Sequence, residues 1–386
     1  MIVILILWIT FGFLSFGILG LNFLAMKRTA SRPWRLKVDK KYMPKVSIIV
    51  PTYNESYVIR FKLENLAKID YPSKFMQIII VDSNSSDSTV SIATKFAEQH
   101  PNLNVRILAE NERKGKTASL NLALRECVGD VVVVSDADCF LPSDILSKSL
   151  PFLSDVNVGA ISGSKLLLNS QQSWVTKTEN TYLNAVNLVK IGESKTGSTL
   201  LFEGGFSAYK RVLLDAFDPY NTGSDDCGTL IEFAVKGSRA LSVPEAVFYT
   251  VFPITWKEKI NVKIRRSNQL IRVLFRYASL FSERRLRGSR SAVIKAIFTY
   301  IVAPVAFIGF AISTIFLFIQ LPYFVLVFLI FILPTIRSYS FESIQNYIIL
   351  LLSMVSVVFN KRFMTWKQPA DRLLLTEDML RQHSLI

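Results

Sequence analysis

Residues 131–134 are four consecutive valines, and this run limits the possible folds more than any other stretch of the chain. An unbroken series of β-branched residues is typical of a strand buried on both faces, as in a parallel sheet covered by helices. Such a strand delivers the residues that follow it to the crevice where α/β proteins bind ligands. Those residues are Ser135, Asp136, Ala137 and Asp138. The sequence therefore predicts an α/β domain with two carboxylates at its ligand site.

Asp136 and Asp138 are separated by one residue, so both carboxylates can converge on one cation around a tight turn. Carboxylate oxygens suit Mn²⁺ or Mg²⁺, and such a cation can hold a diphosphate and neutralise its charge as it leaves. A polar turn without metal is the alternative, because aspartate is common in turns. The flanking motifs described below favour the metal site.

Residues 2–26 contain no charged side chain. At 1.5 Å per residue a helix of this length measures about 37 Å, enough to cross a hydrocarbon core of about 30 Å. A cleaved signal peptide is the alternative, but no positive segment precedes the run and the apolar stretch is too long. We expect a retained membrane anchor, in keeping with a mean hydropathy of +0.33 and 28 phenylalanines.

The net charge of +15 is concentrated beside apolar segments. Residues 27–45 carry eight basic side chains against one acid, and residues 257–295 carry twelve against two. These stretches hold +7 and +10, so the remainder of the chain nets −2. Basic residues next to spans favour the cytoplasmic side and anionic lipid headgroups. We therefore expect no nucleic acid partner, a cytoplasmic central domain in a plasma membrane or its equivalent, and an N-terminus outside.

Cysteine and histidine are scarce. The three cysteines show no paired spacing, which suits a reducing compartment, and only two histidines occur. A metal site or a general base in this chain must therefore be built from carboxylates.

The segment before the valine run alternates between strand and helix patterns. Apolar stretches at 46–50, 77–81 and 104–108 predict strands, while 55–69, 90–99 and 118–127 predict helices. This order is typical of a nucleotide-binding α/β sheet. Lys114, Gly115 and Lys116 stand at the entry of the third helix, where ammonium groups and free amides can receive phosphate. A solvated charge run is the alternative there.

Four motifs in this order resemble the family 2 inverting glycosyltransferases with a GT-A fold: Pro51–Glu55, Val81–Asp87, Lys114–Lys116 and Asp136–Asp138. The resemblance covers about residues 45–275 and implies a GT-A nucleotide-sugar domain, an α/β mixed sheet, beside an α-helical membrane part. It implies that Lys116 contacts phosphate and that Asp136 and Asp138 hold the diphosphate and metal. It also implies that the nucleotide is bound by Pro51, Tyr53, Glu55 and Asp82.

Two later motifs resemble the acceptor side of that family. Residues 202–206 are similar to its Phe-x-Gly segment, which implies that Glu203, Gly204 and Gly205 face the acceptor; small residues there let a sugar approach the backbone. Residues 223–230 are similar to its Asp-Asp motif. This implies Asp226 as the catalytic base that deprotonates the acceptor hydroxyl, with Asp225 as a supporting acid. Capping of the following helix is the alternative and is compatible with catalysis.

Residues 256–277 are amphipathic and basic, and predict a helix in the membrane interface. Within them, Gln269 and Arg272 resemble the Gln-x-x-Arg-Trp motif of processive members, whose arginine binds the diphosphate. Val273 replaces the tryptophan, which puts the processive role in doubt. Residues 171–190 also show helical periodicity and either pack on the domain or lie on the membrane.

Three more apolar stretches occupy about 293–319, 321–336 and 343–359. The last two are short for spans, and Lys361, Arg362 and Lys367 favour a cytoplasmic tail, so we expect three spans in total with one short segment interfacial or broken. The predicted organisation is a membrane helix at 1–26, a basic linker at 27–44, the GT-A domain at 45–255, interface helices at 256–290, membrane helices at 291–360 and a cytoplasmic tail at 361–386.

The resemblance implies a metal-dependent inverting hexosyltransferase that uses Mn²⁺ or Mg²⁺ and a nucleotide diphosphate sugar. GDP-mannose is the first expected donor, and the acceptor is expected to be linked to polyprenyl or dolichyl phosphate, for glycan assembly such as that of N-glycans. A processive polysaccharide synthase using a UDP-sugar is the enzymatic alternative. A catalytically silent membrane protein that binds nucleotide or a partner is the alternative from another class.

Overall fold

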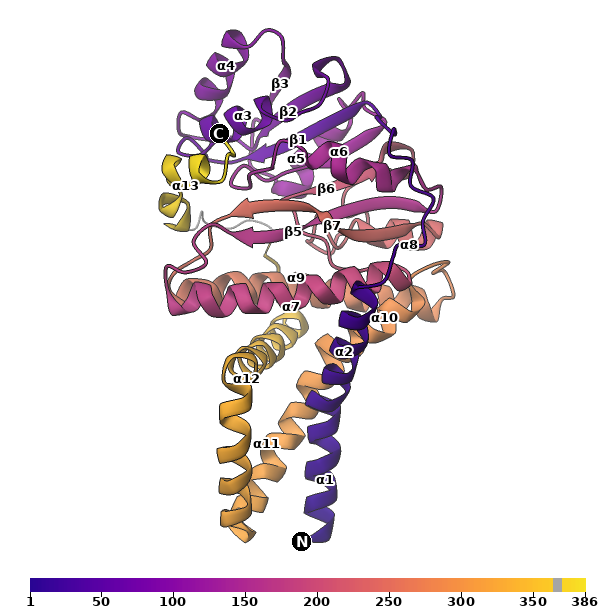
Figure 1. The fold of residues 1–386 in the computed structure, drawn as a ribbon, viewed down its shortest axis with the longest axis vertical. Helices are drawn as coiled ribbons and strands as arrows, with labels where there is room; N and C mark the ends of the chain where they lie inside the picture. The colour runs from indigo at the N-terminus through magenta and orange to yellow at the C-terminus, as the bar shows by residue number, and fades with distance from the viewer. Residues whose placement is uncertain (364–369) are drawn as a thin grey trace.

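The computed structural model describes residues 1–363 and 370–386. Its upper part is a mixed seven-stranded sheet in the order β3-β2-β1-β4-β6-β5-β7 (Figure 1). β1, β2, β3 and β4 are parallel, whereas β6 is antiparallel to both β4 and β5. The GT-A fold class predicted from the sequence is confirmed. The strands are β1 (Val46–Thr52), β2 (Met76–Asp82), β3 (Asn104–Ala109), β4 (Val131–Val134), β5 (Val158–Leu167), β6 (Ser207–Lys210) and β7 (Arg239–Thr250).

The sheet is covered on both faces. Val131 and Val133 belong to the apolar cluster that contains Leu63 of α3, whereas Val132 and Val134 belong to the cluster that contains Leu120 of α5. Fully burying one such side chain stabilises the fold by about 1.5–3 kcal/mol, so the valine strand holds both layers to the sheet. The helices of this domain are α3 (Ile59–Ala67), α4 (Thr89–Gln99), α5 (Lys116–Leu124), α6 (Ile145–Ser149) and α8 (Leu230–Lys236), with short helical turns at Ser73–Phe75, Leu150–Ser154 and Arg211–Leu213.

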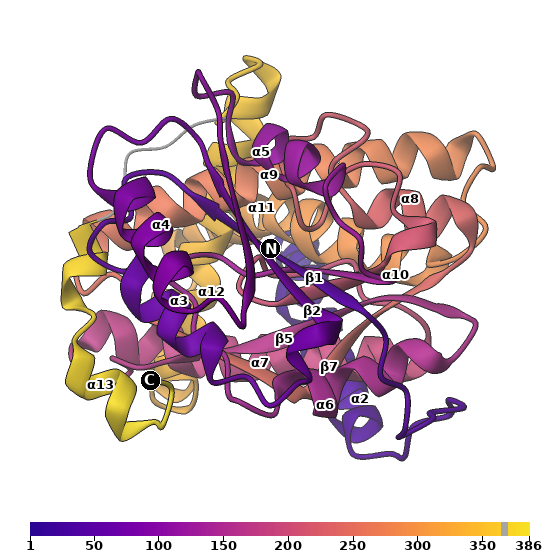
Figure 2. The same cartoon turned by 90° about the horizontal axis from the view of Figure 1, so that it is seen from above.

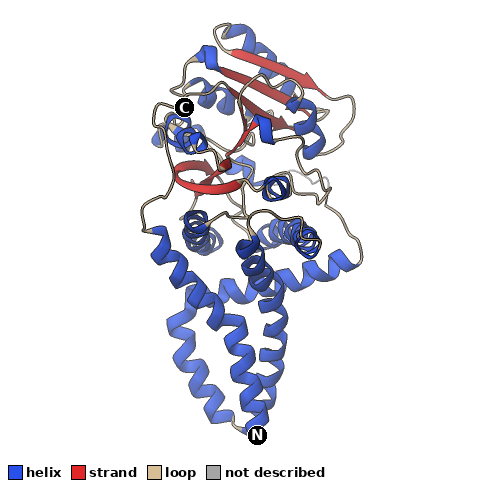
Figure 3. Cartoon of the chain, turned by 90° about the vertical axis from the view of Figure 1, so that its right-hand side faces the viewer, coloured by secondary structure: helices blue, strands red, loops and turns tan. Residues whose placement is uncertain are grey.

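Long apolar helices project from the opposite side of the molecule (Figures 1 and 3). Among the residues that the structure describes, two helical stretches, Ile2–Ala30 and Arg290–Gln320, are long and apolar enough to cross a membrane. The first comprises α1 (Ile2–Gly12), a π-helical turn (Phe13–Gly17) and α2 (Ile18–Ala30); the second comprises α10 (Arg290–Ile297), a π-helical turn (Phe298–Val302) and α11 (Ala303–Gln320). Ile6 and Ile9 of α1, and Ile315 and Ile319 of α11, are exposed, as expected for side chains that face lipid.

The predicted stretches 321–336 and 343–359 lie on one continuous helix, α12 (Pro322–Val358), rather than on two separate segments. The polar residues between them interrupt the apolar pattern but not the helix. Figure 1 shows that α12 changes direction: its first part runs beside α11, and its last part lies beneath α9. The number of membrane spans stays a prediction, and Lys367 lies outside the described residues.

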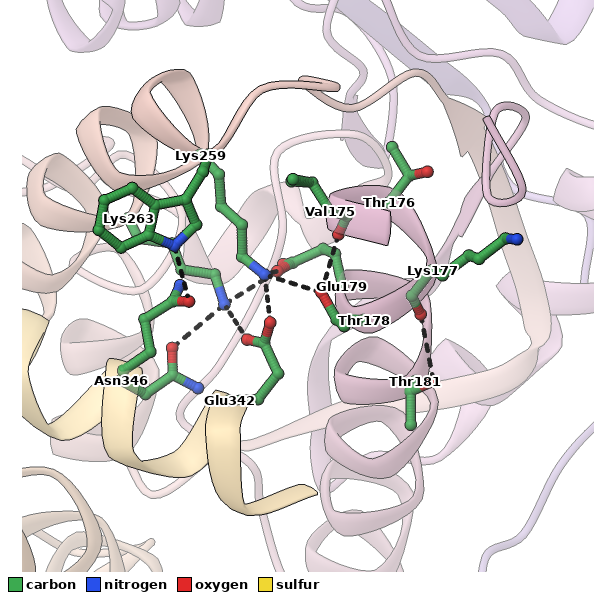
Figure 4. A network of polar contacts seen from close by, with 12 residues as sticks. Val175, Thr176, Lys177, Thr178, Glu179, Thr181, Lys259, Lys263, Glu342 and Asn346 are labelled. Atoms are coloured by element: carbon green, nitrogen blue, oxygen red, sulfur yellow. Dashed lines mark hydrogen bonds and ion pairs between the residues drawn. The ribbon is translucent and has the colours of Figure 1, made fainter. Parts of the chain in front are cut away.

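Two long helices, α7 (Trp174–Thr196) and α9 (Trp256–Ser282), lie between the sheet and the apolar helices (Figure 1). Both were expected from their periodicity, and α7 contacts both β7 and α12. A buried network joins them to α12: Lys259 and Lys263 of α9 pair with Glu179 of α7 and Glu342 of α12 (Figure 4). Two ammonium groups meet two carboxylates, so this network is balanced in charge and joins the α/β domain to the apolar helices.

The C-terminal residues pack on the α/β domain beside α3 (Figure 2). After the turn Ala370–Leu374 and the helix α13 (Glu377–Gln382), the amide of Asn65 in α3 donates to the carbonyl of Leu385 at 2.8 Å. The hydroxyl of Tyr57 donates to the carbonyl of Leu375 at 3.0 Å. The part of the predicted tail from Ala370 onward therefore belongs to the domain surface.

Candidate active site

A cavity of about 400 Å³ opens where β1 and β4 end and continues toward α7 and α9. Its lining includes Pro51 and Asp136 at the strand ends, and Tyr300 and Leu350 of the apolar helices. The carboxyl ends of parallel strands form such crevices, because the helices that follow leave opposite faces of the sheet. Most site residues expected from the sequence meet here.

The turn after β4 is held by backbone contacts. The N–H of Asp136 donates to the carbonyl of Gly204 at 3.1 Å, and the hydroxyl of Ser135 donates to the carbonyl of Gly205 at 2.7 Å. Beneath them the buried ammonium of Lys62 donates to Ser135 at 2.7 Å. Burial lowers the pKa of Lys62 to about 8. The valine strand thus presents its two aspartates on a fixed turn.

Oxygen atoms of Asp136 and Asp138 lie within 4.8 Å of one another and of the Cys139 sulfur. Two convergent carboxylates fit the oxygen-rich coordination of Mn²⁺ or Mg²⁺. Burial, and then the charge of Asp138, raise the pKa of the Cys139 thiol well above its usual range, so Cys139 stays protonated and is a poor ligand for a hard cation. The residues therefore fit a cation held by Asp136 and Asp138.

Lys116 joins the donor motifs to the predicted catalytic pair. It begins α5 after Gly115, whose φ of 97° suits glycine, and its ammonium lies 2.7 Å from Asp136 and 2.8 Å from Asp225. Burial disfavours the charge on Lys116, but Asp136 and Asp225 outweigh burial and raise its pKa. The side chain predicted to contact phosphate is thus held charged at the centre of the cavity.

Asp226 is oriented by its neighbours. One carboxylate oxygen accepts from the Ser224 hydroxyl at 2.5 Å and from the Cys227 N–H at 2.6 Å. Burial, and then the adjacent Asp225, raise the pKa of Asp226. A raised pKa makes a carboxylate a stronger proton acceptor, provided that it remains ionised at working pH. The two acids differ in setting, because Asp225 is neutralised by Lys116 and Asp226 is held by hydrogen bonds.

The two glycines of the predicted acceptor segment have a packing reason in this structure. A Cβ on Gly204 would lie 2.7 Å from the Lys116 ammonium, and one on Gly205 would lie 2.0 Å from the ring of Phe248. The sequence motif predicts that they let a sugar approach the backbone. The structure instead shows that the glycines make room for protein side chains, while both line the cavity beside Glu203.

The predicted nucleotide residues divide into two groups. Pro51, Tyr53 and Glu55 line the cavity, whereas Asp82 is not among its lining residues. Asp82 is buried, and its carboxylate accepts from the Thr52 hydroxyl at 3.0 Å and from the Ser85 N–H at 2.8 Å. In this structure Asp82 braces the ends of β1 and β2, so the geometry does not support the expected contact with nucleotide.

The two predicted donor-binding residues of α9, Gln269 and Arg272, also differ in whether they line the cavity. Gln269 lines the cavity and donates to the carbonyl of Gly223 at 2.6 Å, which ties α9 to the loop carrying Asp226. Arg272 is one helical turn away and is not among the lining residues. Its guanidinium donates to the carbonyl of Lys361 at 2.9 Å, so the diphosphate contact expected for it is not what this geometry shows.

Four arginines that the sequence did not single out also line the cavity, Arg113, Arg265, Arg266 and Arg372, and two of them contact predicted site residues. The guanidinium of Arg113 lies 3.6 Å from the centre of the Tyr53 ring, a stacking contact beside the predicted base site. Arg372, from the C-terminal turn, pairs with Glu55 and lies 3.8 Å from a carboxylate oxygen of Asp138. Arg113 lies beside the lysines of the phosphate motif, a signal that could have found it, whereas only tertiary structure places Arg372.

Replacing Arg372 with alanine should lower the Mn²⁺ concentration that half-saturates nucleotide-sugar binding by about tenfold. A unit positive charge a few ångströms from a divalent cation costs on the order of 1 kcal/mol even at the dielectric constant of water, about 80. Titration of donor binding against Mn²⁺ measures the effect, with Arg381→Ala on exposed α13 as the control. An unchanged or higher Mn²⁺ requirement would show that Arg372 does not compete with the cation.

A family model described as Glycosyltransferase like family 2 matches residues 44–269. Among curated proteins, a probable glycosyltransferase of Bacillus subtilis is 28% identical over 66% of this chain and 61% of its own length. A beta-monoglucosyldiacylglycerol synthase of Synechocystis is 30% identical over 47% of this chain and 39% of its own length. The matches thus span at most about three fifths of these relatives.

Among solved structures, a mannosyltransferase from Pyrobaculum calidifontis in complex with GDP-Man and Mn²⁺ aligns with a TM-score of 0.78. It is 28% identical, and the alignment covers 93% of this chain and all of that one. The matched segment of the family model, residues 44–269, contains the sheet, the aspartate turn and the Asp225–Asp226 loop. The chain therefore belongs to the Glycosyltransferase like family 2.

Proposed function

We propose that the protein is a membrane enzyme that transfers a hexose, with inversion, from a nucleotide diphosphate sugar to an acceptor linked to polyprenyl or dolichyl phosphate. One observation carries this proposal. A single cavity joins the Asp136–Asp138 turn to side chains of the membrane part such as Tyr300 and Leu350. Both a soluble donor and the headgroup of a membrane lipid can reach such a cavity.

The donor end of the cavity suits a nucleotide sugar. Tyr53 and Arg113 form a platform for the base, and Lys116 supplies a charged ammonium for phosphate. A divalent cation bound by Asp136 and Asp138 would neutralise the charge of the leaving diphosphate. GDP-mannose is our first candidate, supported by the likeness to the mannosyltransferase solved with GDP-Man and Mn²⁺.

At the acceptor end, Asp226 is the proposed catalytic base. A sugar hydroxyl is a weak nucleophile at neutral pH, and a positioned carboxylate can take its proton as the new bond forms. Hydrogen bonds from Ser224 and Cys227 fix the orientation of this carboxylate. Attack from the side opposite the diphosphate then inverts the anomeric carbon in one displacement.

Transfer of radiolabel from GDP-mannose, UDP-glucose and UDP-N-acetylglucosamine into a membrane lipid extract tests the function. We expect Mn²⁺-dependent label in the organic phase, with GDP-mannose the best donor. Label in an insoluble polymer would instead favour the processive synthase. Label in diacylglycerol would favour a neutral acceptor, as the name of the Synechocystis relative suggests. No incorporation from any donor would favour a non-catalytic binding protein.

The proposed location is a plasma membrane or its equivalent, with the catalytic domain in the cytoplasm. Figure 1 places the N-terminus and the turn between α11 and α12 at one end of the molecule and the α/β domain at the other. In sealed vesicles, single cysteines at Lys40 and Arg381 should react from the cytoplasmic side, and one at exposed Tyr323 from the opposite side. Equal access of all three positions from one side would contradict this arrangement.

A further inference from the structure

A second cluster of buried charges lies in the same cavity, one residue from Gly204. The ammonium groups of Lys165 on β5 and Lys190 on α7 each lie 2.7 Å from a different oxygen of Glu203. The side chains of Lys165 and Lys190 are 7% and 1% exposed, yet both line the cavity. Two buried cations therefore share one carboxylate.

This cluster differs from the network of Figure 4, where two lysines meet two acids. An ammonium group can donate three hydrogen bonds. Among the described residues, Glu203 is the one acceptor that contacts the ammonium groups of Lys165 and Lys190. Burying a charge that has no opposite charge beside it costs free energy, unless a bound group of opposite charge compensates it. The cluster therefore has both spare donors and a surplus positive charge facing the cavity.

The surroundings of the cluster favour an anionic amphiphile. From Lys165 to α9 along the chain, five cationic side chains line the cavity against four carboxylates, those of Glu179, Glu203, Asp225 and Asp226. Apolar residues continue from this region to the membrane part. The lining cations are Lys165, Lys190, Lys263, Arg265 and Arg266. The apolar lining residues are Leu183, Val186, Leu270, Tyr300 and Leu350.

We propose that Lys165 and Lys190 bind a phosphate group of the acceptor lipid, with Glu203 as the counter-ion that keeps the empty site stable. Burial opposes the charge of Glu203, but Lys165 and Lys190 hold its pKa below the usual range, so the carboxylate stays ionised between them. Phosphate then adds acceptor oxygens for the remaining N–H donors. The inference rests on the proposed function, because it names the acceptor of the same site.

The position of the cluster would place a bound phosphate close to the donor sugar. Glu203 precedes Gly204, whose carbonyl accepts from the N–H of Asp136. A phosphate held at Glu203 would therefore sit beside the donor turn, with its apolar chain directed along the lining of α7 and α9. The same site would give a neutral glycerolipid little advantage, since such a headgroup has no charge to match.

The test compares binding of farnesyl phosphate and farnesol to the full-length protein in detergent, by calorimetry without donor. The wild type should prefer the phosphate at least roughly tenfold, because hydrogen bonds to charged groups are the stronger class. Lys190→Met, which leaves a neutral Lys165–Glu203 pair and no surplus charge, should reduce the preference to within about twofold. Lys177→Met is the matched control, because Lys177 is exposed on α7 and points away from the network in Figure 4.

Glu203→Gln alone separates binding from a purely structural role. Removing the competing carboxylate should leave phosphate binding as tight as in the wild type or tighter. The proposal is overturned if Lys190→Met retains the preference, if Glu203→Gln weakens phosphate binding as much as Lys190→Met, or if inorganic phosphate competes as well as farnesyl phosphate. Donor binding is measured in the same preparations, so failure of sugar-nucleotide binding would reject the proposed function without changing the phosphate preference.

Discussion

Replacing Asp226 with asparagine is expected to lower sugar transfer at least roughly hundredfold, because a positioned general base contributes about 10² to 10⁴ in rate. Asparagine keeps the size of the side chain and can still accept hydrogen bonds from Ser224 and Cys227. It cannot take a proton from the acceptor. Donor binding should be nearly unchanged, since Lys116 contacts Asp225 and Asp136 rather than Asp226. Single-turnover transfer and nucleotide-sugar binding, measured separately, distinguish the two effects.

Asp215→Asn is the control for this variant, because Asp215 is an exposed acid of the same region that pairs with Lys236 at the surface. Its transfer rate should match the wild type. A phosphate oxygen is already largely anionic at neutral pH and needs no base. If Asp226→Asn stays within about tenfold of the wild type, the base assignment fails and a bare lipid phosphate becomes the better nucleophile.

Asp138→Ala should abolish the difference between donor binding in Mn²⁺ and in EDTA. In the wild type this difference should be large, because the cation would neutralise both the carboxylates and the bound diphosphate. Lys116 alone cannot replace it, since its charge is already shared by Asp136 and Asp225. Calorimetric titration of the nucleotide sugar in Mn²⁺, Mg²⁺ and EDTA measures the effect.

Cys139→Ala is the matched control, because Cys139 belongs to the same cluster but stays protonated. It should retain the difference between Mn²⁺ and EDTA. Equal donor binding by the wild type in EDTA and in Mn²⁺ would contradict the assignment of Asp136 and Asp138 as metal ligands, regardless of how the variants behave.

The fold could be predicted because its signals are local. The valine run, the strands at 46–52 and 76–82 and the aspartate turn each follow from neighbouring residues, and parallel strands bring their ends together. The helix after Pro51 begins at Ile59 rather than near Glu55, because Asn54 adopts a left-handed conformation and the chain forms a loop that faces the cavity. The antiparallel β6 has no such local signal and depends on tertiary pairing.

The site was predicted where motif residues lie at strand ends, and missed where partners come from distant segments. Lys165 and Lys190 stand on a strand and a helix with ordinary patterns, and only the folded chain brings them to Glu203. Arg372 reaches Glu55 across more than 300 residues of sequence. For Asp82 the motif predicts nucleotide binding, and in this structure its carboxylate accepts hydrogen bonds from Thr52 and Ser85; its contact with nucleotide stays a prediction.

The anomeric configuration of the lipid product tests the proposed single displacement most directly. Sugars in GDP-mannose and UDP-glucose are α-linked, so attack by an acceptor deprotonated by Asp226 predicts a β-linked product. The one-bond carbon–hydrogen coupling at the anomeric carbon of the purified lipid distinguishes the two forms by nuclear magnetic resonance. A β-linked product is the expected result. An α-linked product would contradict direct attack and with it the role assigned to Asp226.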